Sequence, residues 1–418
     1  MRLWEYLREK MKRYKNRIAF AASGTTYAEL LKSDGEPQER RKLTVCEGET
    51  REGQAIAILK CLAKGGTCVP VTREYGSREY EKITEKVKAY QGETDDLAFV
   101  VFTSGTSGEP KGVMLTDDNI ISNLEAIGSY FRLENRRTIC IGRPLVHIAV
   151  LTGELLYALC SGLTVHFYEE SFMPRRLLSF FERYQIDVFG GTPTLYRALA
   201  RAARGQIFPI RTAVLSGEVL TETAAREIAA AFPGTEFYHV YGLTEHSPRV
   251  SALPPSEFRR RATSVGKPIA GISVRLEDGE LWVRSKSVMK GYLEDEERTR
   301  DKITDGWLHT GDLARFDGEG NLYIDGRKDG MLIRAGLNVY PEAIENAVKE
   351  ECAEVADCLV YGEQTEGSVT LCMKYVGEIS ERDLKRKLAE RLNNALLPGK
   401  IQRVEELPKT PSGKKLRR

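Results

Sequence analysis

Two patterns of apolar residues alternate along most of the chain. Short runs rich in β-branched and aromatic residues are followed by longer segments whose apolar residues recur every three or four positions, which is the period of an amphipathic helix. The short runs predict strands at residues 163–168, 186–189, 212–215 and 236–240, and the periodic segments predict helices at 175–184, 193–204 and 221–232. Regular alternation of strand and helix predicts an α/β fold with a largely parallel sheet.

The pattern changes at about residue 264. Short strands separated by glycine turns follow, at residues 274–276, 280–284 and 321–324, and then a stretch dense in charge and glycine at 326–330. Beyond it, two helical segments, at 341–350 and 380–395, alternate with strands. We therefore predict a large N-terminal domain of parallel-type sheets with helices, residues 1–328, and a small C-terminal α+β domain, residues 329–418.

Residues 103–112, Thr-Ser-Gly-Thr-Ser-Gly-Glu-Pro-Lys-Gly, carry the clearest chemical signal. They follow an apolar run at 97–102 that predicts a buried strand. The glycines let the backbone approach a ligand closely, and the hydroxyls, N–H groups and Lys111 suit an anion. The spacing excludes the Walker A loop, which needs G-x-x-x-x-G-K-[ST]. A plain surface turn needs neither the paired Thr-Ser-Gly units nor the Pro-Lys-Gly ending, so we predict a phosphate-binding loop.

Composition narrows the class of protein. The 418 residues carry a formal net charge of +2, which gives no reason to expect nucleic-acid binding. The eight cysteines form no C-x-x-C pair and several lie among apolar residues, so we expect buried reduced thiols rather than disulfides or zinc ligands. The N-terminus lacks the apolar core of a signal peptide, and glycines, a glutamate and a histidine interrupt the apolar stretch at 148–168. We expect a cytoplasmic protein without membrane insertion.

Five motifs occur in a fixed order: the glycine loop and residues 241–245, 310–312, 326–329 and 408–414. Their order and approximate spacing resemble the adenylate-forming superfamily, which contains acyl- and aryl-CoA synthetases, the adenylation domains of nonribosomal peptide synthetases and firefly luciferase. The resemblance covers the chain from Trp4 to its last residues and implies an ATP-dependent reaction in two steps. A carboxylate attacks the α-phosphate and releases pyrophosphate, and a thiol of CoA or of a carrier protein's phosphopantetheine then takes the acyl group. Because both first reactants are anionic, such a site must neutralise charge as well as align them.

The resemblance also implies roles for individual residues. The β- and γ-phosphates would be wrapped by Thr103, Ser104, Gly105, Thr106 and Ser107, assisted by Lys111. Thr244 would hydrogen-bond the α-phosphate, and Glu245 would hold Mg²⁺ through a hard carboxylate oxygen. Lys414 would reach into the site and stabilise charge between the carboxylate and the α-phosphate. Asp329 would be the hinge about which the small domain rotates between the two steps.

A second group of residues would hold the nucleoside. The adenine would be bordered by Tyr241, Gly242, Ser216, Gly217 and Glu218. Asp312 would accept hydrogen bonds from the ribose hydroxyls, and Arg327 would add a positive charge near the ribose or phosphate. Taken singly, each motif has a plainer interpretation as a turn, a packed tyrosine or a surface acid. Five motifs in order favour the functional interpretation over these, and over a degenerate nucleotide-binding scaffold.

The acid-binding side is less well defined by the sequence. His147 lies in a Pro-x-x-His stretch similar to one in acyl- and aryl-CoA ligases, where the histidine lines or gates the acyl pocket; a purely structural histidine is the alternative. Amino-acid-activating domains usually carry an aspartate near this region, and residues 141–150 contain none, which argues against an amino acid as substrate. The candidate pocket walls are Val146, His147, Leu151, Phe189, Gly190, Gly191 and Thr192. We expect Gly190 and Gly191 to leave room for the uncharged acyl or aryl tail of a small-molecule carboxylic acid.

Two departures from the family pattern bear on partners. Ala335, Gly336 and Leu337 stand where CoA ligases often carry two glycines and an acid beside the pantetheine path, so a carrier protein is an alternative to CoA as acceptor. Only 102 residues precede Thr103, which predicts an abbreviated N-terminal subdomain. Such a change could alter dimerisation or pocket depth, and it leaves the oligomeric state open.

Overall fold

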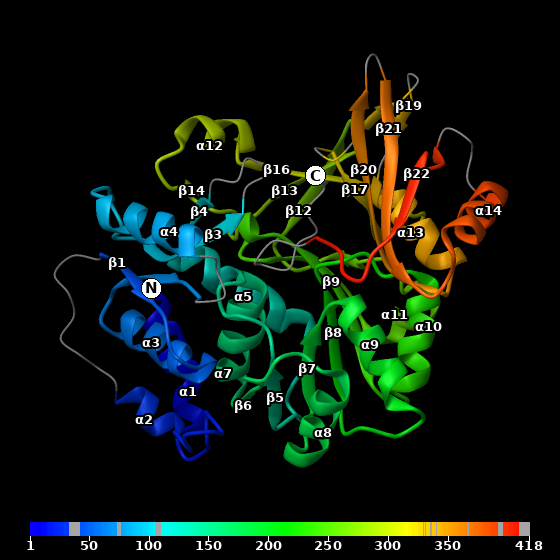
Figure 1. Cartoon of the computed structure of the whole chain (residues 1–418). Helices are drawn as coiled ribbons and strands as arrows, with labels where there is room; N and C mark the ends of the chain where they lie inside the picture. The colour runs from blue at the N-terminus through cyan, green and yellow to red at the C-terminus, as the bar shows by residue number, and fades with distance from the viewer. Residues whose placement is uncertain are drawn as a thin grey trace.

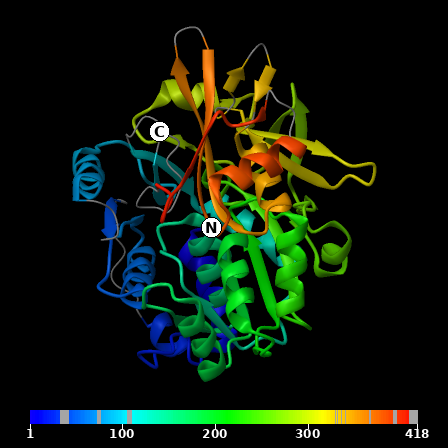
Figure 2. The same cartoon turned by 45° about the vertical axis from the view of Figure 1, so that its right-hand side comes forward.

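The computed structural model describes residues 1–32, 42–72, 77–104, 110–328, 330, 332–334, 337–339, 341–365, 368–391 and 396–408. These residues form a mixed α/β structure whose large N-terminal part contains three sheets and whose smaller C-terminal part contains its own (Figure 1). The C-terminal strands, orange and red, stand above the blue and green N-terminal elements in both views (Figure 2). The predicted fold class is confirmed.

The central sheet contains seven strands: β5 (Thr138–Ile141), β6 (Thr164–Phe167), β7 (Val188–Gly191), β8 (Thr212–Ser216), β9 (Glu236–Gly242), β10 (Arg249–Leu253) and β11 (Lys267–Pro268). They lie in the order β11-β10-β9-β8-β7-β5-β6. The run from β6 to β9 is parallel, whereas β10 and β11 are antiparallel additions at one edge. The four strands predicted here from sequence are β6 to β9.

Helices cover both faces of this sheet. Neighbouring residues of a strand point to opposite faces, so each strand packs against both layers of helices. Phe189 packs in a core cluster with one set of helices, and Val188 packs in the cluster on the other face. The first set is α8 (Pro174–Tyr184), α9 (Pro193–Ala203), α10 (Glu222–Ala231) and α11 (Pro255–Arg261). The second set includes α1 (Leu3–Met11), α5 (Asp117–Tyr130) and α7 (Tyr157–Ser161). Three of the first set, α8 to α10, are the helices that the periodicity predicts.

The second sheet contains the predicted phosphate loop. Its strands are β1 (Leu43–Cys46), β2 (Thr67–Pro70), β3 (Leu97–Ser104), β4 (Pro110–Thr116) and β14 (Gly291–Tyr292), in that order. The first three are parallel, and β3 and β4 form an antiparallel hairpin with Thr103 opposite Lys111. The helices α2 (Tyr27–Leu31), α3 (Arg51–Ala63) and α4 (Ser77–Ala89) belong to the same part of the chain. The glycine loop thus joins two strands of a hairpin.

The third sheet follows the change of pattern at residue 264. Its strands are β12 (Ser273–Glu277), β13 (Glu280–Arg284), β16 (Trp307–Phe316) and β15 (Ile303–Thr304), and β17 (Leu322–Arg327) pairs with β16. Helix α12 (Glu296–Lys302) precedes β15. The Thr-Gly-Asp motif lies inside the long strand β16 rather than in a turn.

The C-terminal part has its own core. Strands β20 (Val355–Thr365), β21 (Ser368–Gly377) and β22 (Lys400–Arg403) form a sheet, and β18 (Leu332–Arg334) pairs with β19 (Leu337–Val339). Helices α13 (Pro341–Glu351) and α14 (Glu381–Arg391) contribute Ile344 and Leu384 to its buried cluster. The smaller second domain is therefore present, whereas its exact boundary after residue 328 stays a prediction because Asp329 lies outside the described residues.

The apolar stretch after His147 is broken into short elements. They are α6 (Ile148–Val150), a π-helical segment (Leu151–Leu156), α7 and β6, and all contribute buried residues. Among the described residues, no helix combines the length and the apolar character that crossing a bilayer requires.

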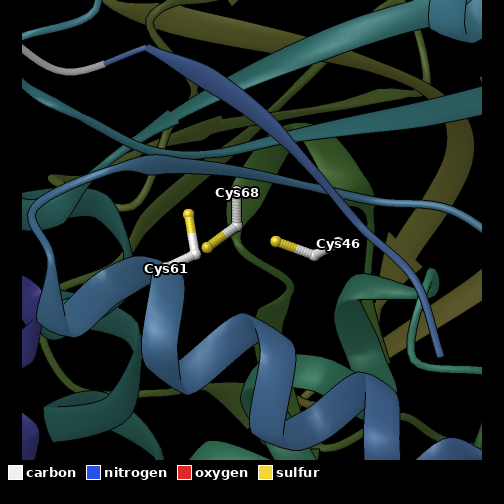
Figure 3. Close-up of side chains that lie close together, drawn as sticks. All are labelled: Cys46, Cys61 and Cys68. Atoms are coloured by element: carbon white, nitrogen blue, oxygen red, sulfur yellow. The ribbon is translucent and has the colours of Figure 1, made fainter. Parts of the chain in front are cut away.

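Three cysteines meet in the core of the N-terminal part. The Sγ atoms of Cys46 on β1, Cys61 on α3 and Cys68 on β2 all lie within 4.8 Å of one another (Figure 3). Burial raises the pKa of the Cys68 thiol well above its ordinary value. The three thiols pack among the apolar side chains of this core, as small hydrophobic groups do. All eight cysteines are free and seven are buried, as the sequence predicts.

Candidate functional site

Two strand ends of the central sheet place the first candidate residues together. Ser216 ends β8 and Tyr241 and Gly242 end β9, with Ser216 opposite Val240 in the register. A 3-10 turn, η3 (Thr244–His246), begins two residues later. Because carboxyl ends of neighbouring parallel strands share one edge, the candidate adenine and α-phosphate residues lie at that edge.

Asp312 is held by two donors from different strands. The Tyr241 phenol donates to its Oδ2, and Nη1 of Arg327 donates to its Oδ1 at 3.1 Å. Arg327 stands directly opposite Asp312 in the β16–β17 register. Burial raises the pKa of Asp312, and the Arg327 charge and the tyrosine hydrogen bond act against that rise. The carboxylate is therefore fixed in place and keeps lone pairs that can accept hydroxyl donors.

Glu280 on β13 binds the backbone immediately before Asp312, and the sequence analysis did not identify it. Its Oε1 accepts from the Gly311 N–H at 2.9 Å, and its Oε2 accepts from Lys328 Nζ at 2.9 Å. Gly311 has a φ of +76°, a conformation that favours glycine. Burial alone would raise the pKa of Glu280, but hydrogen bonds from Lys328 and Gly311 bring it below its ordinary value. Glu280 thus links the backbone at Gly311 to Lys328, the residue that precedes the predicted hinge.

Glu245 is linked to the base of the glycine loop through Tyr292. The Tyr292 phenol donates to Oε1 of Glu245 at 2.8 Å, and the backbone N–H of Met289 donates to the Glu245 carbonyl at 2.9 Å. Tyr292 belongs to β14 and stands opposite Val113, whereas Lys111 Nζ lies 5.9 Å from the centre of the Tyr292 ring. The hydrogen bond orients Glu245 and leaves lone pairs on its oxygens. Its hard carboxylate fits Mg²⁺ beside a phosphate loop.

Lys302 is another residue near the site that the sequence analysis did not identify, and it carries a positive charge. It ends α12, and its Nζ donates to the Thr310 carbonyl at 3.1 Å. Burial lowers the pKa of Lys302, and the charges of Glu245 and Asp312 act against that change. The ammonium group is therefore close enough to both carboxylates to interact with their charges. Its helix is rich in charged residues, so the sequence alone suggests a solvated face.

The segment after β8 is hydrogen-bonded to the start of α9. An oxygen of the Glu218 side chain accepts from the Thr194 N–H at 3.0 Å, and Gly217 has a φ of +87°. Ser216 is 4% exposed, and its Oγ has no hydrogen-bond partner among the described residues. A buried hydroxyl without a partner points to a water or ligand that completes it.

The acid-binding side differs from the expectation for Gly190. A side chain at Gly190 would collide with Oε1 of Glu154, so the carboxylate of Glu154 occupies the space that the glycine leaves. A side chain at Gly191 would lie 3.1 Å from Leu195. The prediction that these glycines leave room for an apolar tail is therefore wrong, because protein side chains fill that room. His147 is half-buried and precedes α6, and its role as a wall residue stays a prediction.

Several predicted site residues lie outside the described part of the chain. They are Gly105, Thr106, Ser107, Asp329 and Lys414. Ser104 is described only through its backbone, which stands opposite Pro110 in the hairpin. The roles of these residues stay predictions.

Comparison with known proteins identifies the family of the chain. Residues 59–293, more than half of the chain, match the model of the AMP-binding enzyme family, and residues 343–414 match its C-terminal domain. The chain is 31% identical over 344 residues to a feruloyl-CoA synthase of an Amycolatopsis species, covering 77% of this chain and 69% of the relative. It is 33% identical to a long-chain-fatty-acid–CoA ligase of Yersinia pestis, covering 77% of this chain and 61% of that protein.

Solved structures share the fold over the full chain. The o-succinylbenzoate CoA synthetase (MenE) of Bacillus subtilis, in complex with the acyl-adenylate intermediate OSB-AMP, superposes with a TM-score of 0.84 at 23% identity, covering 100% of this chain and 97% of that one. The anthranilate CoA ligase AuaEII in complex with anthranoyl-AMP has a TM-score of 0.84 at 19% identity, covering 99% and 95%. The family resemblance seen in the motifs is confirmed: the chain belongs to the AMP-binding enzyme family.

Proposed function

We propose that this protein uses ATP to convert a carboxylic acid into an acyl-adenylate and then transfers the acyl group to the thiol of CoA. The observation that carries the proposal is that two carboxylates are held in place at the end of β9: Asp312 contacts Tyr241 there, and Glu245 lies in the turn that follows. Asp312 is held by Tyr241 and Arg327, and Glu245 is held by Tyr292 beside Lys111. The curated relatives named above are CoA synthetases and ligases.

In the first step, a carboxylate oxygen of the acid forms a bond to the α-phosphorus, and the bond to the pyrophosphate oxygen breaks. Asp312 holds the ribose, and Thr244 donates to an α-phosphate oxygen. Thr103 to Ser107 and Lys111 bind the pyrophosphate as it leaves. Glu245 holds Mg²⁺, which neutralises phosphate charge when bound. These groups act by position and charge rather than by covalent chemistry.

In the second step, the thiol sulfur attacks the acyl carbonyl carbon, loses its proton and displaces AMP. Lys414 stabilises charge in the first step and leaves when the small domain rotates about Asp329. Lys328, next to that hinge, is anchored to Glu280 in this structure. The sequence of the loop at Ala335, Gly336 and Leu337 favours a carrier-protein phosphopantetheine as the second candidate acceptor. We place the reaction in the cytoplasm, where ATP and CoA are present.

The test is ATP–pyrophosphate exchange with a panel of carboxylic acids, followed by transfer to CoA or to phosphopantetheinylated carrier proteins. The proposal expects exchange that depends on the acid and a thioester product with AMP. Exchange with amino acids alone would instead establish an amino-acid-activating enzyme. ATP binding by calorimetry without exchange on any acid would indicate a nucleotide-binding scaffold.

A further inference from the structure

Three charged residues, Arg143, Glu154 and Arg249, interact in the interior beside the candidate acid pocket. Together with Thr152, which is buried two positions before Glu154 in the chain, we refer to them as the buried polar cluster. They are Arg143 after β5, Thr152 and Glu154 on the π-helical segment, and Arg249 at the start of β10. Nη2 of Arg143 donates to Oε1 of Glu154. Thr152, Glu154 and Arg249 are each at least 97% buried. Ionic groups so deeply buried are uncommon unless they are paired or bind a ligand.

The cluster has unused hydrogen-bonding capacity. Among the described residues, no partner is within reach of Oε2 of Glu154, Oγ1 of Thr152, Nε of Arg143 or Nε of Arg249. A buried polar atom without a partner costs free energy, and native proteins leave few of them. Four such atoms on adjoining residues point to a bound molecule that supplies the missing partners.

The charge of the cluster indicates the sign of that molecule. Two guanidinium groups face one carboxylate, and Arg143 takes up the described contact of Glu154. Arg249 makes no ion pair within the described part of the chain. It shares a side-chain hydrogen bond with Tyr130, and its other charged neighbours are Glu154 and Arg143. Burial lowers the pKa of Arg249, as expected for a cation without an adequate counter-charge. The cluster therefore has an excess positive charge that an anion would balance.

Arg249 is held rigidly in this position. Its N–H donates to Oδ1 of Asn123 at 3.1 Å, and its carbonyl accepts from Nδ2 of the same residue at 3.0 Å. Gly153 lies against its guanidinium, since a side chain there would come within 2.9 Å of Nη2. A fixed backbone and a glycine facing the guanidinium are what a preorganised anion site requires.

The cluster adjoins both halves of the proposed reaction site. Arg249 stands opposite Gly242 in the β9–β10 register and follows Glu245 by four residues. Glu154 fills the space at Gly190, which is a predicted wall of the acid pocket. Arg143 also lines a groove of about 440 Å³, whose other charged walls are Arg51, Glu169 and Glu170 and whose apolar walls include Phe172 and Phe189. The cluster therefore borders the predicted acid side of the site and lies next to the strand end that carries the nucleotide residues.

We propose that Arg249, with the Arg143–Glu154 pair, binds a second anionic group at the far end of the acid, so that the substrate is a dicarboxylic acid or an acid of equivalent charge. This inference rests on the proposed function and names the substrate class for it. A hydrocarbon tail would leave the four polar atoms unpaired. A terminal ammonium group would face two guanidinium groups at close range. The protonated donors of arginine match a carboxylate in both charge and geometry.

The experiment compares acids with matched skeletons in the exchange assay with the full chain: adipic, hexanoic and 6-aminohexanoic acids, and terephthalic, benzoic and 4-(aminomethyl)benzoic acids. We expect kcat/KM for the diacid to exceed that for the matching monoacid by roughly tenfold or more, the value of one charge-assisted hydrogen bond. Arg249→Met should remove this preference, and Arg249→Lys should retain part of it. ATP binding by calorimetry should stay unchanged in both variants, which shows that they are folded.

Arg197→Met is the matched control. Arg197 is also a buried arginine, but it pairs with Glu227 at 2.6 Å and lies on α9 away from the cluster. It should keep the preference for diacids. A wild-type preference for monoacids or amino acids, or a preference that Arg249→Met leaves unchanged, would overturn this inference while leaving acid activation intact. Absence of exchange with every acid would overturn the proposed function itself.

Discussion

The phenol of Tyr292 donates a hydrogen bond to Oε1 of Glu245 at 2.8 Å and joins two segments separated by 47 positions in the sequence. The tyrosine comes from the sheet that carries the glycine loop, and the glutamate comes from the edge of the central sheet. This contact fixes the carboxylate that we assign to Mg²⁺ beside the lysine that we assign to the leaving pyrophosphate.

Tyr292→Phe should therefore weaken the response to Mg²⁺. Loss of a hydrogen bond to a charged group is worth about 1.5 kcal/mol, so we expect the Mg²⁺ concentration for half-maximal exchange to rise roughly tenfold. Tyr323→Phe is the control, because that phenol contacts Asp317 at 3.4 Å rather than a candidate site residue. An unchanged Mg²⁺ titration in Tyr292→Phe would show that this contact does not orient a metal ligand.

Asp312→Asn should reduce recognition of the ribose. The wild-type protein should prefer ATP to 2′,3′-dideoxy-ATP, because Asp312 is fixed with lone pairs available for hydroxyl groups. The variant should lose most of that preference, by roughly tenfold in KM, since an amide oxygen is a weaker acceptor than a carboxylate. Asp325→Asn, which changes an exposed partner of Arg315, should keep it. Equal discrimination in both variants would contradict the assignment.

Because His246 is buried, we expect the folded protein to lose stability in acid. Burial lowers its pKa to about 4, and its neutral ring donates from Nδ1 to the Arg249 carbonyl at 3.0 Å and accepts at Nε2 from Ser285 at 2.7 Å. Between pH 6.5 and 4 the unfolded chain binds a proton at this site and the folded chain does not, so stability falls as the pH falls through this window. The contribution is on the order of 3 kcal/mol. Urea midpoints measured from pH 8 to pH 4 should fall less steeply for His246→Gln; an identical slope would refute the account.

Gly190→Ala should impair the acid side selectively. The added methyl group collides with the carboxylate of Glu154, and overpacking of this kind costs about 1–3 kcal/mol. We expect a higher KM for the acid and a lower melting temperature, with an unchanged KM for ATP. Gly128→Ala is the control, because its nearest neighbour would lie 3.9 Å away and alanine favours a helix. If both variants have the same KM for the acid, Glu154 does not shape the pocket.

The candidate nucleotide residues can be recognised from the sequence because they lie in short motifs whose residue types match the chemistry. Tyr241 and Asp312 are 71 positions apart, the motifs assign both to the nucleoside, and the structure brings the two side chains into contact. The alternation of strand and helix also predicted β6 to β9 and the helices between them, since both periods are local properties of the chain.

The supporting residues could not be found in the same way. Tyr292, Glu280 and Lys302 owe their positions to strand pairings and to a helix packed from a distant part of the chain. Lys302 lies in a charged helix that resembles a solvated surface. The Gly190 prediction failed for a related reason: a glycine indicates open space only if no other segment enters it, and the π-helical segment brings Glu154 there.

Acid-dependent exchange by the wild-type protein and by Lys414→Ala tests the central claim most directly. The account predicts exchange only in the presence of the correct acid, with AMP released once a thiol acceptor is added. It also predicts that Lys414→Ala loses at least about a hundredfold of the exchange, because a fixed cation that stabilises the transition state is worth roughly 3 kcal/mol or more. The same variant should still convert a preformed acyl-adenylate and thiol into a thioester. Exchange that does not depend on any acid, or hydrolysis of ATP to ADP, would contradict the account.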